Sequence, residues 1–330
     1  MRRTKIVATL GPATESEEKI VGLLKAGVNL FRFNMKYSPA NWHNQRIALI
    51  RKNAVKLNTR VGIMIDIPSN DFKIEIDDYD WVALSYLKSA KEVLKLKKRL
   101  ANTKVIAKIE NGEAMKNLID IASVSDGLMV ARGDLGRETP IEELALFQKK
   151  IIDMGRISGK PVIVATEMLY SMVKSITPTR AEATDVANAV FDGTDALMLS
   201  EETAIGDHPI EAVEVMSRIA AFCENSGELR LIDLKAKSLI DALTESAAKI
   251  VNDKLDQPIK TILVFTQSGA SATMMSKYRL NVPVTAISKD EKVLNRLCLS
   301  YGINPTIQEP VRTDTTLVIR RGALTIYSNS

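Results

Sequence analysis

Short apolar runs alternate with amphipathic stretches over the first two hundred residues. The runs are rich in Val, Ile and Leu, and nearly all are followed by helical periodicity; they occupy residues 4–10, 28–33, 60–66, 81–87, 104–109, 127–132, 161–166 and 196–202. Continuous apolar runs are typical of buried parallel strands, which need crossover helices to connect them. No GxGxxG motif follows the first run, so the pattern favours a (β/α)8 TIM barrel over an open doubly wound sheet.

One connection in this pattern is unusual. Between the third and fourth runs lies only IPSNDFKIEIDDYD, which begins with the turn formers Pro68, Ser69 and Asn70. A segment of this length and composition leaves room for at most one turn of helix. We therefore expect the third barrel helix to be missing or vestigial, which would leave a gap in the outer ring.

The pattern changes after about residue 225. A long helix is expected over residues 227–254, and strands are expected over residues 261–266, 284–288, 305–309, 317–321 and 324–328. Helices should begin near Ala270 and Glu291, and the last two strands read as a hairpin. We predict two domains, a barrel over residues 1–225 and a smaller α/β domain over residues 226–330.

Polar residues gather at the C-terminal ends of the predicted strands, where barrels of this kind carry their active sites. Glu110 and Asp134 follow neighbouring strands, and their oxygen atoms could anchor Mg²⁺ or Mn²⁺ while water and substrate complete the shell. Lys108 would then lie beside a metal-bound anion, where it could stabilise an enolate or a transferring phosphoryl group. The alternative is that these charged residues lie in solvent-exposed loops and that one of the carboxylates caps a helix.

Composition narrows the possible partners. The net charge is +5, but aromatic residues make up only 5% and basic residues are mixed with acidic ones, so small anionic substrates fit better than nucleic acid. Cys223 and Cys298 lie far apart, which favours a reducing compartment. His43 and His208 are too few for a zinc site and are expected at the surface. Without a signal peptide or a membrane-spanning apolar run, we expect a cytoplasmic protein.

Five long motifs resemble pyruvate kinases: TKIVATLGPA, IAKIENGEAMKN, DGLMVARGDLG, GKPVIVATEML and PTRAEATDVANAVFDGTDALMLSEETAIGDHPIEAV. The resemblance covers residues 4–222 and, more loosely, the rest of the chain, which is similar to the C-terminal domain of that family. It implies Mg²⁺-dependent phosphoryl transfer between phosphoenolpyruvate and ADP, giving pyruvate and ATP in glycolysis. It also implies a homo-oligomer.

The resemblance assigns roles to the residues at the strand ends. Lys108 corresponds to the lysine that stabilises the enolate and bridges the transferred phosphoryl group, and Glu110 and Asp134 correspond to the Mg²⁺ ligands. Thr166 corresponds to the hydroxyl near the enolate carbon, and Ser85 to a polar group beside the metal. The remaining assignments are the backbone amides that hold the pyruvate carboxylate, at Ala131, Arg132 and Gly133, the nucleotide-phosphate contact Arg32, and the monovalent-cation ligands Asn34 and Asp66.

The chain also departs from the family. The lid domain of pyruvate kinases is inserted after the third strand, where this chain has only residues 67–80. The family's serine and threonine ligands of the monovalent cation are Lys36 and Ile67 here. Because an ammonium group conserves the charge, we predict that Lys36 replaces K⁺ and that K⁺ is not required.

The loop TQSGAS of the second domain resembles the family's sugar-phosphate effector site. Its candidate anion ligands are Thr266, Ser268, Gly269 and Ser271, because hydroxyls and amides at a strand-to-helix turn suit a phosphate. A simple helix cap explains the same residues equally well.

Three functions remain open at this point. The first is a lid-less pyruvate kinase with weak activity, because the enolpyruvate and metal half of the site is retained while the nucleotide half is eroded. The second is a metal-dependent lyase or decarboxylase that acts on oxaloacetate or a related keto acid through the same enolate. The third is a non-catalytic metabolite sensor. Nucleotide preference, effector and oligomeric state are not determined by the sequence.

Overall fold

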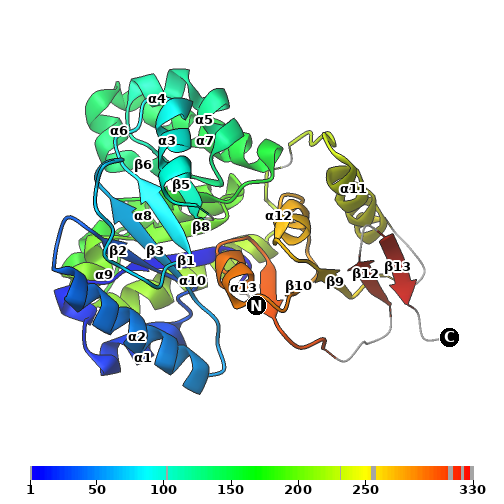
Figure 1. The fold of residues 1–330 in the computed structure, drawn as a ribbon, viewed down its shortest axis with the longest axis horizontal. Coiled ribbons are helices and arrows are strands. Elements are labelled where there is room, and N and C mark those ends of the chain that lie inside the picture. Colours follow the sequence, from blue (N-terminus) through cyan, green and yellow to red (C-terminus); the bar gives the residue numbers. More distant parts are fainter. Residues whose placement is uncertain are drawn as a thin grey trace.

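The computed structural model describes residues 2–101, 103–230, 232–253, 258–310, 315–320 and 323–327, with residues 326 and 327 described by their backbone alone. The eight apolar runs form a closed parallel barrel (Figure 1). Its strands are β1 (Lys5–Thr9), β2 (Leu30–Asn34), β3 (Gly62–Ile67), β4 (Trp81–Leu84), β5 (Lys104–Ile109), β6 (Gly127–Ala131), β7 (Val162–Ala165) and β8 (Ala196–Leu199). β1 pairs with both β2 and β8, which closes the ring and confirms the predicted barrel.

Helices surround the barrel in the order that the periodicity predicts. They are α1 (Glu17–Ala26), α2 (Ala40–Lys56), α3 (Ala90–Arg99), α4 (Gly112–Lys116), α5 (Leu118–Val124), α6 (Arg132–Glu138), α7 (Leu144–Ser158), α8 (Arg180–Phe191), α9 (Glu201–Ala204) and α10 (Pro209–Asn225), with short 3₁₀ turns at Pro12–Thr14, Ile141–Glu143 and Tyr170–Val173. The ends of α1 show how residues next to a helix determine where it begins and ends. Ser16 caps its first turn by accepting from the Lys19 N–H at 3.2 Å, and Gly27 ends it with φ +99°.

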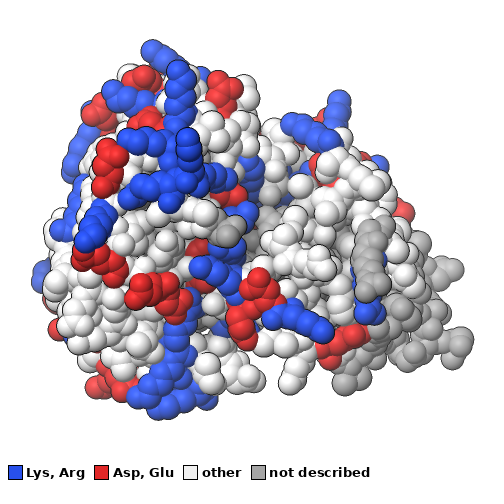
Figure 2. Space-filling view, in the orientation of Figure 1, with Lys and Arg blue, Asp and Glu red and all other residues white. Residues whose placement is uncertain are grey.

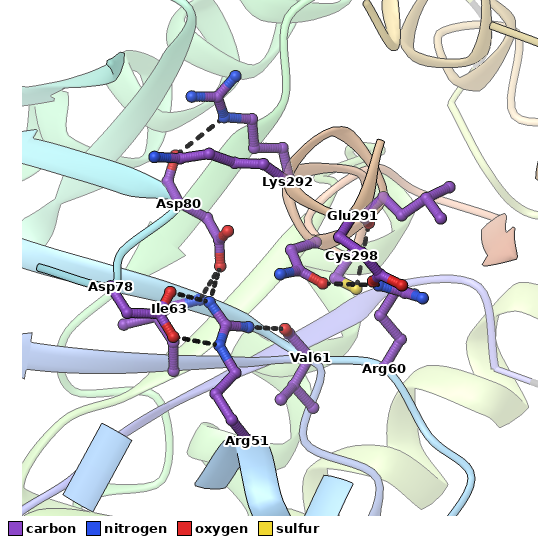
Figure 3. Close-up of polar contacts among 12 residues, drawn as sticks. Arg51, Arg60, Val61, Ile63, Asp78, Asp80, Glu291, Lys292 and Cys298 are labelled. Carbon is purple, nitrogen blue, oxygen red and sulfur yellow. Dashed lines mark hydrogen bonds and ion pairs between the residues drawn. The ribbon is translucent and has the colours of Figure 1, made fainter. Parts of the chain in front are cut away.

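The third barrel helix is missing as expected, because no helix lies between β3 and β4 and residues 68–80 form a loop. The loop covers the barrel with its own apolar residues, among them the buried Ile76. Arg51 of α2 fixes its far end through ion pairs with Asp78 and Asp80, at 2.9 and 2.8 Å (Figure 3). Asp80 in turn accepts from the Ile63 N–H at 2.7 Å, so the loop end is attached to β3 itself.

The second domain is built on a sheet of five strands in the order β11-β10-β9-β12-β13. Its elements are α11 (Leu239–Asn252), β9 (Thr261–Phe265), α12 (Ala270–Ser276), β10 (Val284–Ile287), α13 (Glu291–Leu297), β11 (Ile303–Thr306), β12 (Thr316–Arg320) and β13 (Ala323–Tyr327). β12 and β13 are antiparallel, which confirms the predicted hairpin. This sheet has a hydrophobic core of its own, separate from that of the barrel. The domain boundary after residue 225 stays a prediction that these two cores support.

Two expectations from the sequence are wrong. The helix expected from residue 227 begins only at Leu239. Arg230 is held against the barrel instead, because its N–H donates to Phe191 O at 2.7 Å and its side chain pairs with Asp153. His43 is buried rather than solvated. Its ring stacks edge-on against Phe33 and Trp42, since it lies on the apolar face of α2.

The second domain packs against the N-terminal ends of the barrel strands, with α12 and α13 facing the barrel (Figure 1). Asp195, which directly precedes β8, is the centre of this contact. It accepts from Ser276 at 3.2 Å, from Arg279 at 2.8 Å and from the Tyr301 N–H at 3.1 Å. Arg60 makes a second contact with Glu291 of α13 (Figure 3). The opposite end of the barrel, where the strands terminate, is left free of this domain.

Candidate active site

Lys108 lies at the centre of a buried polar cluster at the C-terminal ends of β3, β4 and β5. Its ammonium nitrogen is 2.7 Å from Glu110 Oε1, 3.2 Å from Asp66 Oδ2 and 2.8 Å from Ser85 Oγ. The side chain is 9% exposed, and those of Asp66 and Glu110 are 3% and 1% exposed. The strands thus bring together four of the residues that the sequence placed at their ends.

Arg32 completes this cluster from β2. Its Nε and Nη2 both donate to Asp66 Oδ2, at 2.9 and 2.7 Å, and its Nη1 donates to Thr9 Oγ1 at 3.2 Å. β2 and β3 pair in a register that sets Asn34 opposite Asp66. Arg32 lies two residues before Asn34 on the same face of β2, so its side chain can reach Asp66. Two cations therefore share the Asp66 carboxylate, an arrangement that the sequence did not predict.

Burial and charge act against each other in this cluster. Burial alone would lower the pKa of the Lys108 ammonium, but Asp66 and Glu110 outweigh it and raise that pKa. Burial would raise the pKa of Asp66, yet Lys108 and Arg32 hold it below its ordinary value. For Glu110 burial dominates, so its pKa is raised despite the neighbouring Lys108. Of these two buried carboxylates, Glu110 is therefore the one that takes up a proton more readily.

The two predicted metal ligands have oxygen atoms to spare. Glu110 Oε2 accepts from the Tyr86 N–H at 2.5 Å, while Oε1 is buried and, although close to Lys108, receives no well-aligned hydrogen bond. The side chain of Asp134, in the first turn of α6, makes no hydrogen bond or ion pair within the described part of the chain. No group of three or more His, Cys, Asp or Glu side chains converges among these residues. A pair of carboxylates suits Mg²⁺, which usually keeps several waters.

Thr166 is held in a strained turn beside Gly133. Both Thr166 and Glu167 have positive φ angles, +65° and +54°, which are costly for residues with a Cβ. The Thr166 hydroxyl accepts from the Gly133 N–H at 2.8 Å. This contact connects the end of β7 to the amides at Ala131, Arg132 and Gly133 that the resemblance assigns to the substrate carboxylate.

The Arg132 side chain explains how the strained turn persists. Its guanidinium donates to the carbonyl oxygen of Thr166 at 2.7 Å and to that of Glu167 at 3.2 Å, and it pairs with Asp185 at 2.6 Å. The side chain is thus directed away from the barrel axis and fixes the backbone that carries Thr166. Sequence reasoning identified only the Arg132 amide and missed this role of its side chain.

The structure places the Lys36 ammonium next to Tyr86. Its nitrogen is 3.2 Å from the Tyr86 hydroxyl and 4.7 Å from the ring centroid. Asn34 Oδ1 accepts from the Lys36 N–H at 3.1 Å. Among the described contacts of Asp66, the second positive charge comes from Arg32. The residues predicted for the monovalent cation therefore lie near one another, but Lys36 has a partner of its own.

In the second domain, the candidate anion loop uses its hydroxyls locally. Thr266 Oγ1 accepts from the Gly269 N–H at 2.9 Å, and Ser268 Oγ accepts from the Ala270 N–H at 3.4 Å. These bonds stabilise the turn that leads into α12, whose N-cap residue is Gly269. Anion binding through Ser271 and the rest of this loop stays a prediction.

Three further residues support the site and were not singled out as candidates. Thr9 receives Arg32, and Tyr86 directs its N–H at Glu110 from a backbone with φ +55°. Buried Glu202 accepts from Leu169 and Ser200 N–H groups, at 3.0 and 2.7 Å, which connects the loops after β7 and β8. The position of Thr9 at the end of β1 could have indicated it. A positive φ at a tyrosine has no sequence signal.

Comparison with known proteins agrees with this geometry. The family model "Pyruvate kinase, barrel domain" matches residues 1–78 and 69–213, and the model "Pyruvate kinase, alpha/beta domain" matches residues 241–327. The pyruvate kinase of Bacillus licheniformis is 31% identical, over 93% of this chain and 72% of that protein. The chain belongs to the pyruvate kinase family.

Other pyruvate kinases give the same result. That of Clostridium acetobutylicum is 31% identical, over 96% of this chain and 91% of that protein. The crystal structure of a pyruvate kinase from Cryptosporidium parvum superposes with a TM-score of 0.87 at 25% identity, covering 99% of this chain and 96% of that one. No helix in the described residues is long and apolar enough to cross a membrane.

Proposed function

We propose that this chain catalyses Mg²⁺-dependent phosphoryl transfer between phosphoenolpyruvate and ADP, giving pyruvate and ATP, with slow turnover. The observation that carries the proposal is the buried Lys108 ammonium, held between Asp66, Ser85 and Glu110. A buried cation fixed by its surroundings can stabilise charge that develops in the transition state without reorganising. Family membership supports the same reaction.

The reaction assigns a task to each residue of the cluster. An oxygen of ADP attacks the phosphorus of phosphoenolpyruvate, the bond to the enolate oxygen breaks, and Lys108 stabilises the negative charge left there. Glu110 and Asp134 would hold Mg²⁺, which supplies positive charge beside the transferring oxygens. The enolate then takes a proton at its methylene carbon, on the side where the resemblance places the Thr166 hydroxyl.

Slow turnover follows from the open mouth of the barrel. Residues 68–80 form only a short loop. The alignment with the Bacillus enzyme runs over 420 positions although the chain has 330 residues. The match to the barrel model is also split in two, into ranges that overlap at residues 69–78. Both facts support a missing lid domain. Without a lid, water screens the transferring charge, and Arg32, already bonded to Asp66 and Thr9, has little left for nucleotide phosphates.

We also propose that K⁺ is not required. The Asp66 carboxylate accepts two bonds from Arg32 and lies within 3.3 Å of the Lys108 nitrogen, so it is compensated by resident cations. This modifies the expectation from the sequence, because Arg32 rather than Lys36 provides the second charge at Asp66.

A homo-oligomer and a cytoplasmic location complete the proposal. An apolar groove of about 500 Å³ between α5 and α7 is lined by Leu118, Ile119, Phe147 and Met154, and Ile119 is 70% exposed. A second copy could cover such a surface. Cys223 and Cys298 are both free and buried, as expected in a reducing compartment.

A paired assay tests the proposal. Purified protein with Mg²⁺ should convert phosphoenolpyruvate and ADP slowly and with a high ADP requirement, and should exchange the methyl protons of pyruvate in deuterated water, followed by NMR. Decarboxylation of oxaloacetate with Mn²⁺ alone, without kinase turnover, would instead indicate the lyase. Metal-dependent oxalate binding without any turnover would indicate a sensor, and fast turnover at micromolar ADP would contradict the open site.

A further inference from the structure

We call the C-terminal strand ends that carry Lys108, Glu110 and Asp66 the catalytic rim. A cleft of about 260 Å³ lies between the two domains, at the opposite end of the barrel. Its barrel wall comes from the N-terminal ends of β4 to β7, and its other wall comes from α12 and α13 (Figure 1). Lys104 and Lys108 occupy opposite ends of β5. At about 3.3 Å per residue, the cleft therefore begins on the order of 13 Å from the catalytic lysine.

Positive charge exceeds negative charge in this cleft. Lys104, Lys160 and Arg296 line it, against the single carboxylate of Asp126. That carboxylate is already shared between Lys104 at 3.0 Å and Lys97 at 2.6 Å. Figure 2 shows basic side chains along the groove between the two parts of the molecule.

Lys160 is the cation without a counter-charge. Its ammonium donates only to the carbonyl oxygens of Ala122 and Ser123, the latter at 3.0 Å, and no carboxylate of the described residues pairs with it. Burial, together with Lys97 and Lys104, lowers the pKa of Lys160 to about 8 although Asp126 raises it. A half-buried cation in such surroundings is stabilised by any anion that enters.

Two uncharged donors in the cleft also lack acceptors. The indole N–H of Trp81, a residue 5% exposed, has no hydrogen-bond partner, and the Thr273 hydroxyl makes no hydrogen bond within the described residues. The floor is closely packed at Gly159, where a Cβ would lie 2.6 Å from Met274 Sδ. Donors and cations from both domains thus surround one small space.

We propose that this cleft binds a small phosphate-bearing anion, held by Lys104 and Lys160 of the barrel and by Thr273 of the second domain. The unprotonated oxygens of a phosphate group accept hydrogen bonds, which matches a wall of donors. The volume lies just below that of pockets for drug-sized ligands, so inorganic phosphate or a small phosphomonoester is the class that fits. A ligand that contacts both domains stabilises their docking.

Tryptophan fluorescence tests the proposal locally. The chain has two tryptophans, so Trp42→Phe leaves Trp81 as the only one and as a reporter inside the cleft. Phosphate and glycerol phosphate are titrated at constant ionic strength against chloride. We expect a saturable change, and in Lys160→Gln a dissociation constant raised about tenfold or more. Lys160→Arg should retain binding, and Lys174→Gln, which removes an exposed lysine elsewhere, should not affect it.

The outcomes separate the sources of the ligand and the competing site. Tighter binding of glycerol phosphate than of phosphate would identify a phosphomonoester, and the reverse would identify free phosphate. The Lys108→Met variant should give the same fluorescence signal as the parent. If the signal disappears in that variant, the anion binds at the catalytic rim and the proposal is wrong. The absence of a saturable signal up to about 10 mM, or equal affinity in Lys160→Gln, would also overturn the proposal.

Discussion

Asp195, at the N-terminal ends of the barrel strands, and Glu110, at their C-terminal ends, both lie in buried ion networks, but they differ in how completely their oxygens are hydrogen-bonded. At the N-terminal end, both Asp195 oxygens accept hydrogen bonds, from Val162 N–H, Ser276, Arg279 and Tyr301 N–H. At the catalytic rim, Glu110 Oε1 lacks a well-aligned donor, and Asp134 has no partner in the part of the chain that the structure describes.

This difference distinguishes structural charges from functional ones. A buried carboxylate whose oxygens are all hydrogen-bonded fixes two domains in one arrangement and has no free lone pair for a ligand. A rim with incompletely bonded carboxylates beside a fixed ammonium leaves room for a ligand, which in the proposed function is a metal and a substrate. The same residue types therefore serve opposite purposes at the two ends of one set of strands.

The largest effect should follow from Lys108→Met. If Lys108 stabilises the enolate as proposed, loss of its ammonium should reduce kcat about 10³-fold. Steady-state kinetics with phosphoenolpyruvate and ADP, and pyruvate proton exchange, would measure it. Lys174→Met, which removes an exposed lysine paired with Asp207, is the matched control. A normal kcat in Lys108→Met would show that Lys108 has only a structural role.

Asp195→Asn should show the reverse pattern. Breaking a buried, fully bonded ion pair should reduce the free energy of unfolding by about 3 kcal/mol or more. Urea unfolding measures this, and kcat per folded molecule should stay unchanged because the rim is at the other end of the barrel. Asp207→Asn, in an exposed ion pair, should change stability by only about 0.5 kcal/mol. Equal stability losses in both variants would contradict the comparison.

Asp134→Asn should weaken Mn²⁺ binding about tenfold or more, because one of two carboxylates is lost from the site. Calorimetric titration measures the affinity directly and needs no turnover. The exposed Asp120→Asn offers a control with the same change of charge. Unaltered affinity in Asp134→Asn would remove Asp134 from the metal site.

The smallest effect concerns K⁺. Since Asp66 is already compensated by Arg32 and Lys108, replacing K⁺ with tetramethylammonium should change activity, or oxalate binding, by less than about twofold. A stimulation of about tenfold or more by K⁺ would mean that the resident cations do not fill this position.

Much of the fold, and the grouping of several candidate site residues, were predictable from sequence alone, since they depend on local signals. Apolar runs of strand length separated by amphipathic stretches gave all eight barrel strands, and the turn formers after Ile67 predicted the missing helix. Strand ends placed Lys108, Glu110 and Asp66 on one rim, because parallel strands terminate side by side. The capping residues Ser16 and Gly27 likewise act within a few residues of themselves.

Tertiary structure decided what depends on direction and on distant neighbours. Whether Arg32 or Lys36 reaches Asp66, and whether Arg132 turns inward or braces the strained turn at Thr166, is set by side-chain packing that no local pattern encodes. The long helix failed for the same reason, because contacts of Arg230 with the barrel outweigh local helix propensity. The cleft around Lys160 exists only because two domains, distant in sequence, bring their walls together.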